Sequence, residues 1–435
     1  MDTTKVSRLE PEFRKEIENK MRQVEDKKVN FNYCLSCTTC ATNCPFNNMH
    51  SSMNPRIFMR KLVLGMKEDI FKDPFVWNCL ACGRCTMTCP KGFNVAAVVR
   101  TTRGEVNYVK GFNLFHKLFY RGILSRQERL KIVGRLARFY DRSGARWMVS
   151  KSGVLNTFRN IKNMENILPL GIKPPLRTQL SKILKQVDQP KFKIGYFAGC
   201  ATNTFFSEIG KAAILYLQHR GCQVEVPEIQ CCGGPHRNAG DLQEAKRLAK
   251  ENIEIFLKGD FDYIVSDCAT CGSTLKEYQA LFKNDHEMKE KAQQFSEKFL
   301  DLNKFIVDCL TCDEDLNILN QKVTYHDPCH LARELEVTKE PRELLKRIPG
   351  VQFIEMKDAD WCCGGAGSYC FTHQEMSAKI LSVKITNFIE TGAEVLATSC
   401  PACTMQLSAG LRRKGVKADV KHPVQILAES VGVIR

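Results

Sequence analysis

The sequence of 435 residues lacks the features of an exported or membrane-spanning protein. No uninterrupted apolar run reaches the length needed to cross a bilayer. Residues 1–28 are charged and helix-like, without the apolar segment of an export signal. No phosphate-cradling glycine fingerprint follows an expected strand, so a flavin or nicotinamide would have to sit on another subunit. These absences predict a cytoplasmic protein that takes electrons from, or passes them to, a partner.

Cysteine, by contrast, is abundant, with 22 residues. Disulfide scaffolds of this density belong to small secreted domains, and this chain is neither small nor marked for export. Regularly spaced cysteines in a reducing compartment therefore indicate metal ligation. Because exposed iron–sulfur clusters are easily oxidised, we also expect an anaerobic or microaerobic metabolism.

Eight cysteines form two copies of the run C-x-x-C-x-x-C-x-x-x-C-P, which are Cys34, Cys37, Cys40 and Cys44 before Pro45, and Cys79, Cys82, Cys85 and Cys89 before Pro90. This run holds a pair of [4Fe–4S] cubanes, and the fourth cysteine of each run ligates the other cluster. The first cubane group is therefore predicted to be Cys34, Cys37, Cys40 and Cys89, and the second cubane group Cys79, Cys82, Cys85 and Cys44. The alternative, two zinc ribbons, does not need the third and fourth cysteines at these offsets.

Ten further cysteines repeat a second pattern, in which a single Cys, an adjacent pair and a C-x-x-C follow one another. The first set is Cys200, Cys231, Cys232, Cys268 and Cys271, and the second set is Cys329, Cys362, Cys363, Cys400 and Cys403. Gly-Gly follows each adjacent pair, at 233–234 and 364–365, and lets the backbone approach a bulky group closely. The repeat indicates a duplication at domain scale, with thiolates suited to a multi-iron site.

Both copies alternate strands and helices. Strands are expected at 193–197, 222–226 and 263–265 in the first copy, and at 323–325, 351–354 and 395–397 in the second. Such alternation predicts a parallel sheet with helices on both faces. The cysteines then lie just past the carboxyl ends of strands, where open α/β sheets bind their ligands.

The segment between the two cubane runs predicts a helix from Pro55 to residue 65, with Asn54 as its cap. Ile57, Leu62 and Leu64 are expected on or near its apolar face. A helix of this length favours an α-helical ferredoxin over a compact strand-based one.

The predicted fold class is thus an α-helical ferredoxin domain plus an α/β C-terminal half of two duplicated cysteine-rich domains with parallel sheets. The expected boundaries are 1–100 for a charged N-terminal helix and the ferredoxin domain, 101–190 for a basic helical linker, 191–318 for the first cysteine-rich domain and 319–435 for the second.

Most of the net charge of +16 is contributed by the linker. Residues 114–120 and 130–136 place apolar residues at helical spacing with basic residues between them. This pattern suits a basic amphipathic helix on a membrane surface or an acidic partner, or a linker helix whose apolar stripe packs on a neighbouring domain. Nucleic-acid binding is not expected, because no nucleic-acid module surrounds the charge.

These motifs resemble heterodisulfide reductase, whose catalytic subunit carries repeated cysteine-rich "CCG" domains and whose small subunit is a two-cubane ferredoxin. The chain resembles a fusion of the two subunits. The resemblance implies that each complete set, hereafter the first and second CCG set, holds a noncubane [4Fe–4S] cluster. One cluster in one half, with another metal or reduced thiols in the other, is the alternative.

Three histidines adjoin the CCG sets. His236 follows the first cysteine pair, and His326 and His330 flank Cys329. A histidine there is suited to donate a proton to a thiolate leaving group, or it is hydrogen-bonded to the loop backbone. The candidate catalytic residues are His326 and the second CCG set, Cys329, Cys362, Cys363, Cys400 and Cys403. Trp361 is expected to cover a cluster.

The remaining cysteines have other expected roles. Cys222 and Cys370 are predicted to be buried packing residues. Cys309 and Cys312 form a C-x-x-C in an acidic stretch outside both repeats, where a redox pair is a less natural interpretation than a surface pair.

Two functions remain open. The first is an iron–sulfur oxidoreductase subunit, like heterodisulfide reductase, that relays electrons through two cubanes to a noncubane cluster, where a disulfide is reduced or formed. The second is an electron-transfer subunit that links a flavin dehydrogenase, or an electron-transferring flavoprotein of the glycolate, lactate or glycerol-3-phosphate type, to quinone. Either function implies a flavoprotein subunit or a membrane cytochrome as partner, and peripheral membrane contact through residues 101–190 is compatible with both.

Overall fold

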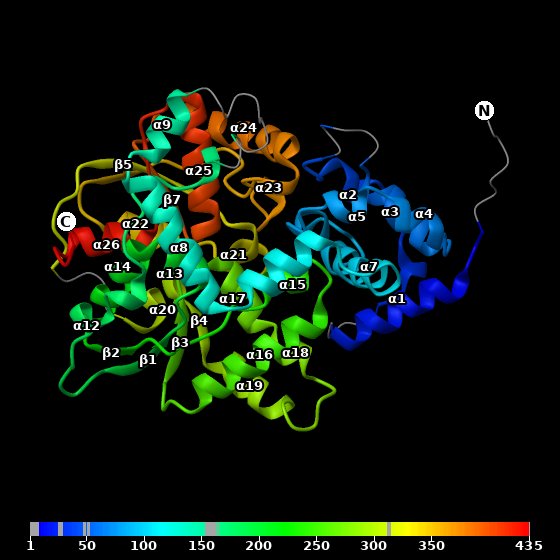
Figure 1. Cartoon of the computed structure of the whole chain (residues 1–435), viewed down its shortest axis with the longest axis horizontal. Helices are drawn as coiled ribbons and strands as arrows, with labels where there is room; N and C mark the ends of the chain where they lie inside the picture. Colours follow the sequence, from blue (N-terminus) through cyan, green and yellow to red (C-terminus); the bar gives the residue numbers. More distant parts are fainter. Residues whose placement is uncertain are drawn as a thin grey trace.

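The structure, a computed structural model, describes residues 8–24, 29–46, 49, 53–152, 162, 165–310 and 315–434. Figure 1 shows the N-terminal helices at one end of the molecule and two sheets at the other, with α8 crossing the face of the C-terminal half. The N-terminal part is helical, as predicted. Its elements are α1 (Pro11–Val24), η1 (Phe31–Tyr33), α2 (Thr39–Thr42), α3 (Pro55–Val63), α4 (Lys67–Lys72), α5 (Phe75–Asn78), α6 (Arg84–Met87) and α7 (Val95–Lys110).

The helix α3 begins where the sequence predicts it. The side-chain oxygen of Asn54 accepts hydrogen bonds from the backbone N–H groups of Arg56 and Ile57, which satisfies donors that the first helical turn leaves open. The predicted apolar face is partly wrong, because Ile57 and Leu64 are exposed. The buried stripe is instead formed by Pro55, Phe58, Met59 and Leu62, which recur at the i, i+3, i+4, i+7 spacing of one helix face.

The C-terminal half contains two four-stranded sheets, and every strand pair is parallel. The first sheet has the order β2-β1-β3-β4, and the second has the order β6-β5-β7-β8. The strands are β1 (Phe192–Tyr196), β2 (Cys222–Glu225), β3 (Tyr263–Ser266), β4 (Phe299–Asp301), β5 (Gln321–His326), β6 (Val351–Phe353), β7 (Val395–Thr398) and β8 (Asp419–Lys421). Six of these were predicted, whereas the edge strands β4 and β8 were not.

Helices cover both faces of the sheets (Figure 1). In the first unit they are α13 (Cys200–Thr204), α14 (Ser207–His219), α15 (Gly234–Asn238), α16 (Leu242–Leu257), α17 (Ala269–Lys276), α18 (Tyr278–Leu281), α19 (Lys289–Lys298) and α20 (Leu302–Cys309). In the second they are α21 (Cys329–Glu334), α22 (Glu340–Arg347), α23 (Tyr369–Thr372), α24 (Gln374–Thr391), α25 (Pro401–Lys414) and α26 (Pro423–Ser430).

The two sheets share their apolar cores. Successive strand residues point to opposite faces, so Ile264 and Leu396 lie in one core cluster, whereas their neighbours Val265 and Ala397 lie in another. Each cluster therefore draws on both β3 and β7. The two units consequently pack as one body rather than as separate domains on a flexible tether.

The linker is helical and packs on the C-terminal half. It comprises the π-helix η2 (His116–Leu124), α8 (Gln127–Arg142), α9 (Ala145–Lys151), η3 (Leu176–Thr178) and α12 (Leu180–Ile183). Leu130 and Gly134 of α8 are buried, and a Cβ at Gly134 would lie 2.5 Å from Cγ2 of Thr204 on α13. One face of α8 therefore packs on the first unit, whereas Ile132 and Leu136 of the predicted apolar stripe are exposed. Both predicted alternatives stay open.

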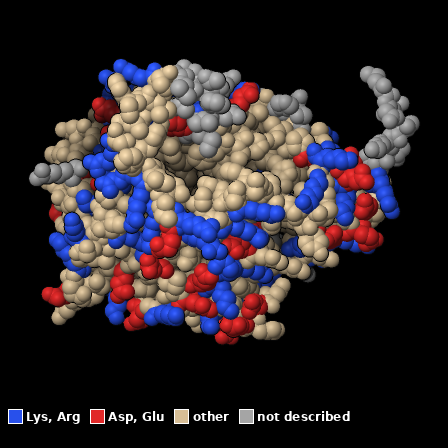
Figure 2. Space-filling model, viewed as in Figure 1, with Lys and Arg blue, Asp and Glu red and all other residues tan. Residues whose placement is uncertain are grey.

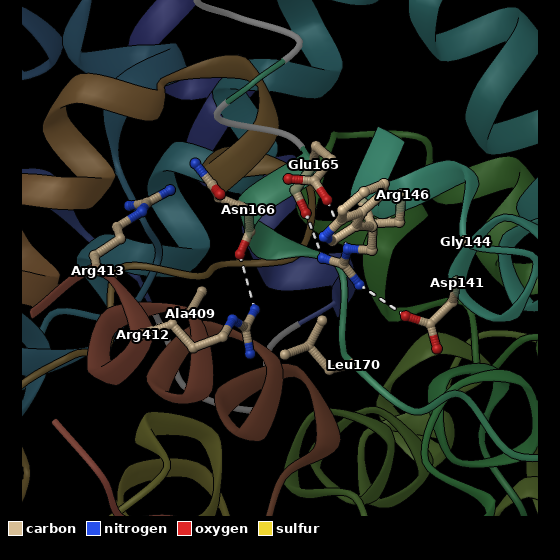
Figure 3. Close-up of a pocket in the computed structure, with 10 residues that line it drawn as sticks. Asp141, Gly144, Arg146, Glu165, Asn166, Leu170, Ala409, Arg412 and Arg413 are labelled. Atoms are coloured by element: carbon tan, nitrogen blue, oxygen red, sulfur yellow. Dashed lines mark hydrogen bonds and ion pairs between the residues drawn. The ribbon is translucent and has the colours of Figure 1, made fainter. Parts of the chain in front are cut away.

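Arg146 holds two parts of the linker together, and Arg412 of α25 joins the linker to the second unit. Arg146 lies 2.6 Å from Oε1 of Glu165 and 3.0 Å from Oδ1 of Asp141, and Arg412 donates to the carbonyl of Asn166 at 2.8 Å. Figure 3 shows these contacts around a cavity of about 530 Å³. No cysteine lines this cavity, so it belongs to the domain junction and not to the metal sites. Within the described ranges, no helix is both long and apolar enough to cross a membrane.

Candidate functional site

The first cubane group is the more exposed of the two. Cys37 is exposed, and a hydrogen bond with Thr39, whose Oγ1 lies 3.3 Å from its Sγ, lowers its pKa. Burial, followed by the charges of Cys34, Cys37 and Cys89, raises the pKa of Cys40 to about 11. These four sulfurs therefore share one neighbourhood, in which Cys89 comes from the other cysteine run.

The second cubane group is more deeply buried. Burial raises the pKa of Cys85 well above its ordinary value, and the charges of Cys79, Cys82 and Cys44 act in the same direction. Cys44 of the first run is thus near the cysteines of the second run. The structure brings the eight cysteines together in the exchanged arrangement that the motif predicts, while iron binding by them stays a prediction.

The two cubane loops repeat one backbone conformation. Ser36 and Ala81, within the first C-x-x-C of each run, both have a φ of 50°, and Thr38 and Gly83 have φ values of 69° and 73°. Three of these four residues carry a Cβ in a region that disfavours it. Non-glycine residues held in this way cluster at functional sites, and here they wrap the chain around the sulfurs.

The first CCG set is assembled from the ends of strands. Cys200 begins α13 after β1, Cys231 and Cys232 precede α15, and Cys268 caps α17 after β3. The sulfur of Cys231 adjoins those of Cys200 and Cys232. That of Cys232 adjoins Cys271. A Cβ at Gly199 would lie 2.8 Å from Sγ of Cys271, so close approach of the backbone is required there.

The second CCG set repeats this construction. Cys329 begins α21 after β5, and Cys400 caps α25 after β7. Sγ of Cys363 lies 3.5 Å from Sγ of Cys403, and the N–H of Gly364 donates to Sγ of Cys362 at 3.4 Å. Hydrogen bonding to Cys363 and to Cys400, together with burial, raises the pKa of Cys403 well above its ordinary value.

The two CCG sets meet at the junction of the two units. The N–H of Ala269 donates to the carbonyl of Ser399 at 3.1 Å, and Oγ1 of Thr270 lies 3.6 Å from Sγ of Cys400. The sulfurs of Cys268 and Cys400 are close enough to alter each other's pKa. The fourth cysteine of each set is thus a neighbour of the other set.

The second cubane group meets the second CCG set beside the buried side chain of Arg333. The charge of Cys362 adds to burial in raising the pKa of Cys82 to about 12. Arg333 of α21 donates to the carbonyl of Cys82 at 2.8 Å and to that of Asp360 at 2.6 Å. Arg103 of α7 donates to the carbonyl of Cys79 at 2.5 Å and to the carbonyl of Asn238, in the first unit, at 2.7 Å. The contacts between ferredoxin and CCG halves are therefore made at the cysteine sites themselves.

The donor set fits iron–sulfur clusters. Every cysteine in the described part of the chain is a free thiol, and the grouped cysteines are crowded together largely out of water. Burial disfavours the thiolate form, so such a cluster of sulfurs is costly unless a cation neutralises it. Metal binding displaces the protons, and sulfur-only groups suit iron–sulfur clusters, for which Cys is the usual ligand.

Histidines and Trp361 line these sites. His326 is buried, and its pKa is lowered to about 3 by burial and by the nearby charge of Lys384. Nδ1 of His330 lies 3.4 Å from Sγ of Cys329. The guanidinium of Arg84 stacks over Trp361, with Cζ 5.1 Å from the ring centroid, so this indole covers the junction between the halves.

His236 lies in a different network. Its Nε2 is 2.9 Å from Oγ of Ser125, and its Nδ1 is 3.8 Å from Oδ2 of Asp241. Asp241 also accepts from Arg121 at 2.7 Å and lies 2.9 Å from Nε2 of His116. This network ties the π-helix of the linker to the loop that follows Cys232.

The remaining cysteines differ in burial. Cys222 and Cys370 are buried, and burial raises the pKa of each to about 12, so both are packing residues as predicted. Cys309 is half-buried beside Tyr263. Its expected partner, Cys312, lies outside the described residues.

The residues that connect one cysteine group to its neighbours were not identified from the sequence, namely Arg333, Arg103 and Thr270. Arg333 is one helical turn beyond Cys329, so the spacing i, i+4 on α21 offers a signal for it. Arg103 and Thr270 offer none, because their partners are distant in the sequence.

The fold and these sites define a class of protein, a two-cubane ferredoxin fused to a duplicated cysteine-rich unit. The chain matches the family descriptions "4Fe-4S dicluster domain" at residues 16–93, "Glycolate oxidase iron-sulfur subunit, linker region" at 113–168 and "Cysteine-rich domain" at 194–276 and 323–408. These matches confirm the predicted fold class and the prediction of multiple [4Fe–4S] clusters.

Relatives extend over the whole chain. It is 32% identical over 434 residues to a Bacillus subtilis protein named "Probable glycolate oxidase iron-sulfur subunit", covering 96% of this chain and 98% of that one. It is 35% identical over 236 residues to "Lactate utilization protein A" of the same organism, covering 54% of this chain and 98% of that one. A Geobacillus protein of that name is 34% identical over the same length, with the same coverage. The chain belongs to this family of CCG-type iron–sulfur proteins.

Proposed function

We propose that this chain is the electron-transfer subunit of a flavoprotein dehydrogenase for a small 2-hydroxy acid of the glycolate or lactate type. The names of its relatives support this function over the heterodisulfide reductase alternative. The lack of a glycine fingerprint for a flavin or nicotinamide agrees with it, because the oxidation of substrate then falls to a separate subunit.

The observation that carries the proposal is the unbroken row of cysteine groups. It runs from exposed Cys37 through the second cubane group to Cys362, and from there across the second CCG set to Cys400 and the first set. When bound, the clusters would supply one-electron carriers. The side chains hold each group against the next, and the apolar core keeps most of the row out of water.

Disulfide chemistry is the second candidate, and one feature favours it. Both CCG sets retain all of their cysteines, which a pure relay does not obviously require. Neither relative's name mentions a sulfur substrate, so we rank this function second.

The linker is the proposed docking face for the electron acceptor. Ile132, Leu136 and Phe139 are exposed on α8, opposite the face that packs on the first unit, and Arg135 and Arg142 are exposed beside them. Figure 2 shows lysines and arginines gathered across this side of the molecule. Apolar residues flanked by arginines suit peripheral contact with an anionic membrane, where a membrane cytochrome and quinone would be reached.

The test uses the anaerobically purified, cluster-loaded chain. It is mixed with a catalytic amount of a flavoprotein 2-hydroxy-acid dehydrogenase, and glycolate or lactate is added. The proposal expects the visible cluster absorption to bleach only when acid and flavoprotein are both present. Failure to bleach, together with reoxidation of the dithionite-reduced chain by a small disulfide alone, would favour disulfide chemistry instead.

A further inference from the structure

The two CCG sets differ at one buried position. His326, the last residue of β5, is 1% exposed. Neither Nδ1 nor Nε2 of its ring has a hydrogen-bond partner in the described structure. A buried polar group without a partner is costly, and native proteins nearly always satisfy such groups. A bound ligand or metal ion would therefore satisfy the ring nitrogens of His326.

Two cysteine sulfurs lie close to the ring of His326 and could bind the same partner. A ring nitrogen of His326 and the Sγ atoms of Cys363 and Cys403 all lie within 4.8 Å of one another. The two sulfurs are themselves 3.5 Å apart. One imidazole nitrogen and two thiolates facing one point form a mixed donor set that transition metals bind.

Both ring nitrogens of His326 are open to a metal, because no described residue hydrogen-bonds to either of them. A neutral imidazole has a lone pair for a metal. His330 differs, because its Nδ1 already lies against Sγ of Cys329 at 3.4 Å.

In the described part of the chain, no histidine is grouped with the sulfurs of the first CCG set; the buried His236 is grouped with His116 and Asp241 instead. Counting back three residues from Cys200, as from Cys329 to His326, gives Phe197. Its ring is buried in the apolar core and stacks on Phe256, with centroids 5.8 Å apart. The same place in the duplicated fold thus holds a phenyl ring in one copy and an unpartnered imidazole in the other.

We propose that His326 is a nitrogen ligand to iron at the second CCG set, whereas the first set binds through thiolates alone. The proposal requires an iron–sulfur cluster at the second set, but it does not depend on the redox partner or on the direction of electron flow. It makes the two sites chemically distinct, because a neutral imidazole brings no negative charge to the iron, whereas a thiolate does.

The test is pulsed EPR on the paramagnetic, anaerobically purified holoprotein, grown with natural histidine or with ¹⁵N-histidine. We expect a directly bonded nitrogen coupling that changes with the label. It should disappear in His326→Cys, a variant that offers a thiolate instead, and persist in His330→Ala.

Three results would overturn the proposal. They are a wild-type spectrum insensitive to ¹⁵N-histidine, a coupling that survives in His326→Cys, and no loss of iron from the protein in Cys363→Ser. The first result is measured on the wild-type protein. The proposal can therefore be refuted even if a variant misfolds. The bleaching assay with flavoprotein is a separate measurement, and its failure would refute the proposed function without bearing on this ligand.

Discussion

Buried cysteines in this chain are of two kinds, which differ in their neighbours rather than in their exposure. Cys222 lies on β2 within an apolar cluster, where burial keeps its thiol neutral. Cys232 is similarly buried, but its sulfur adjoins those of Cys231 and Cys271. Only a cysteine of the second kind is surrounded by the further donors that a cluster needs.

Serine at each position should separate packing from ligation. We expect Cys222→Ser to retain iron and acid-labile sulfide but to lower the free energy of unfolding by about 1–3 kcal/mol, because it buries a hydroxyl among apolar side chains. Cys232→Ser should lose both iron and sulfide. Metal and sulfide analysis with thermal denaturation checks both outcomes, and equal iron loss in the two variants would contradict the assignment.

Asp241 makes the linker contact sensitive to pH. Burial alone would raise its pKa, but hydrogen bonds from His116 and Arg121 hold the pKa well below the ordinary value of 3.8. A carboxylate whose pKa is depressed by folding contributes stability above its ordinary pKa and loses that contribution as the pH falls. Asp241→Asn should therefore lower the melting temperature at pH 7 by several degrees, corresponding to about 1–3 kcal/mol.

The difference between wild type and Asp241→Asn should shrink as the pH falls below about 4. Both proteins are melted at each pH, so that acid effects common to both cancel. Asp260→Asn is the control, because Asp260 is exposed and its ion pair with Lys193 should contribute little. A difference that is constant with pH would show that the carboxylate charge is not what stabilises the contact.

At the scale of the elements, Gly134 allows α8 to pack closely against α13. Alanine is ordinarily better than glycine inside a helix by about 1 kcal/mol. At Gly134, however, a Cβ would lie 2.5 Å from Cγ2 of Thr204. We expect Gly134→Ala to destabilise the protein and to make α8 more sensitive to trypsin, measured by limited proteolysis at its arginines.

The clash predicts a specific rescue. Thr204→Ser removes Cγ2, so Gly134→Ala combined with Thr204→Ser should regain most of the stability, whereas Thr204→Ser alone should change little. A double variant that is no more stable than Gly134→Ala would mean that the helix contact does not depend on this methyl group.

The elements predictable from the sequence are those with complete local signals. The helix α16 (Leu242–Leu257) has such signals, since its cap, Asp241, and the following Gly259 mark its two ends. The strands β4 and β8 are three residues long and carry too little alternation to be recognised. The π-helix η2 was expected only as a helix, because its conformation is fixed by contacts of His116 with Asp241 and of Tyr120 with Ser368.

At the scale of the whole molecule, the sequence predicts the membership of each cysteine group but not the order of the groups. Spacing alone relates Cys44 to the second cubane group. That Cys362 faces Cys82, and that Cys268 faces Cys400, depends on how the halves pack. The sequence also predicts His326 as a proton donor, which stays a prediction; packing alone reveals that its ring is buried without a hydrogen-bond partner in the described structure.

The packing of the halves leads to a last prediction, on the two cubanes. The buried guanidinium of Arg333 contacts the Cys82 loop, and that of Arg56 contacts the Cys37 loop through the carbonyl of Ser36 at 3.0 Å. A nearby positive charge favours the more negative, reduced state of a cluster. Arg333→Gln should therefore lower the reduction potential of the second cubane, and Arg56→Gln that of the first.

The two shifts should differ in size. Arg333 is largely shielded from water and Arg56 is exposed, so solvent screens the charge of Arg56 more strongly. EPR-monitored redox titration of both variants measures the two potentials separately, and each variant serves as the control for the other. If Arg333→Gln moved both potentials equally, or neither, Arg333 would not tune the second cubane selectively. Its role would then be to hold the two halves together. If only the potential of the second cubane shifted, contact with Arg333 would make this cubane a better electron acceptor than it is alone. Electron flow from the exposed Cys37 toward the CCG sets would then be favoured.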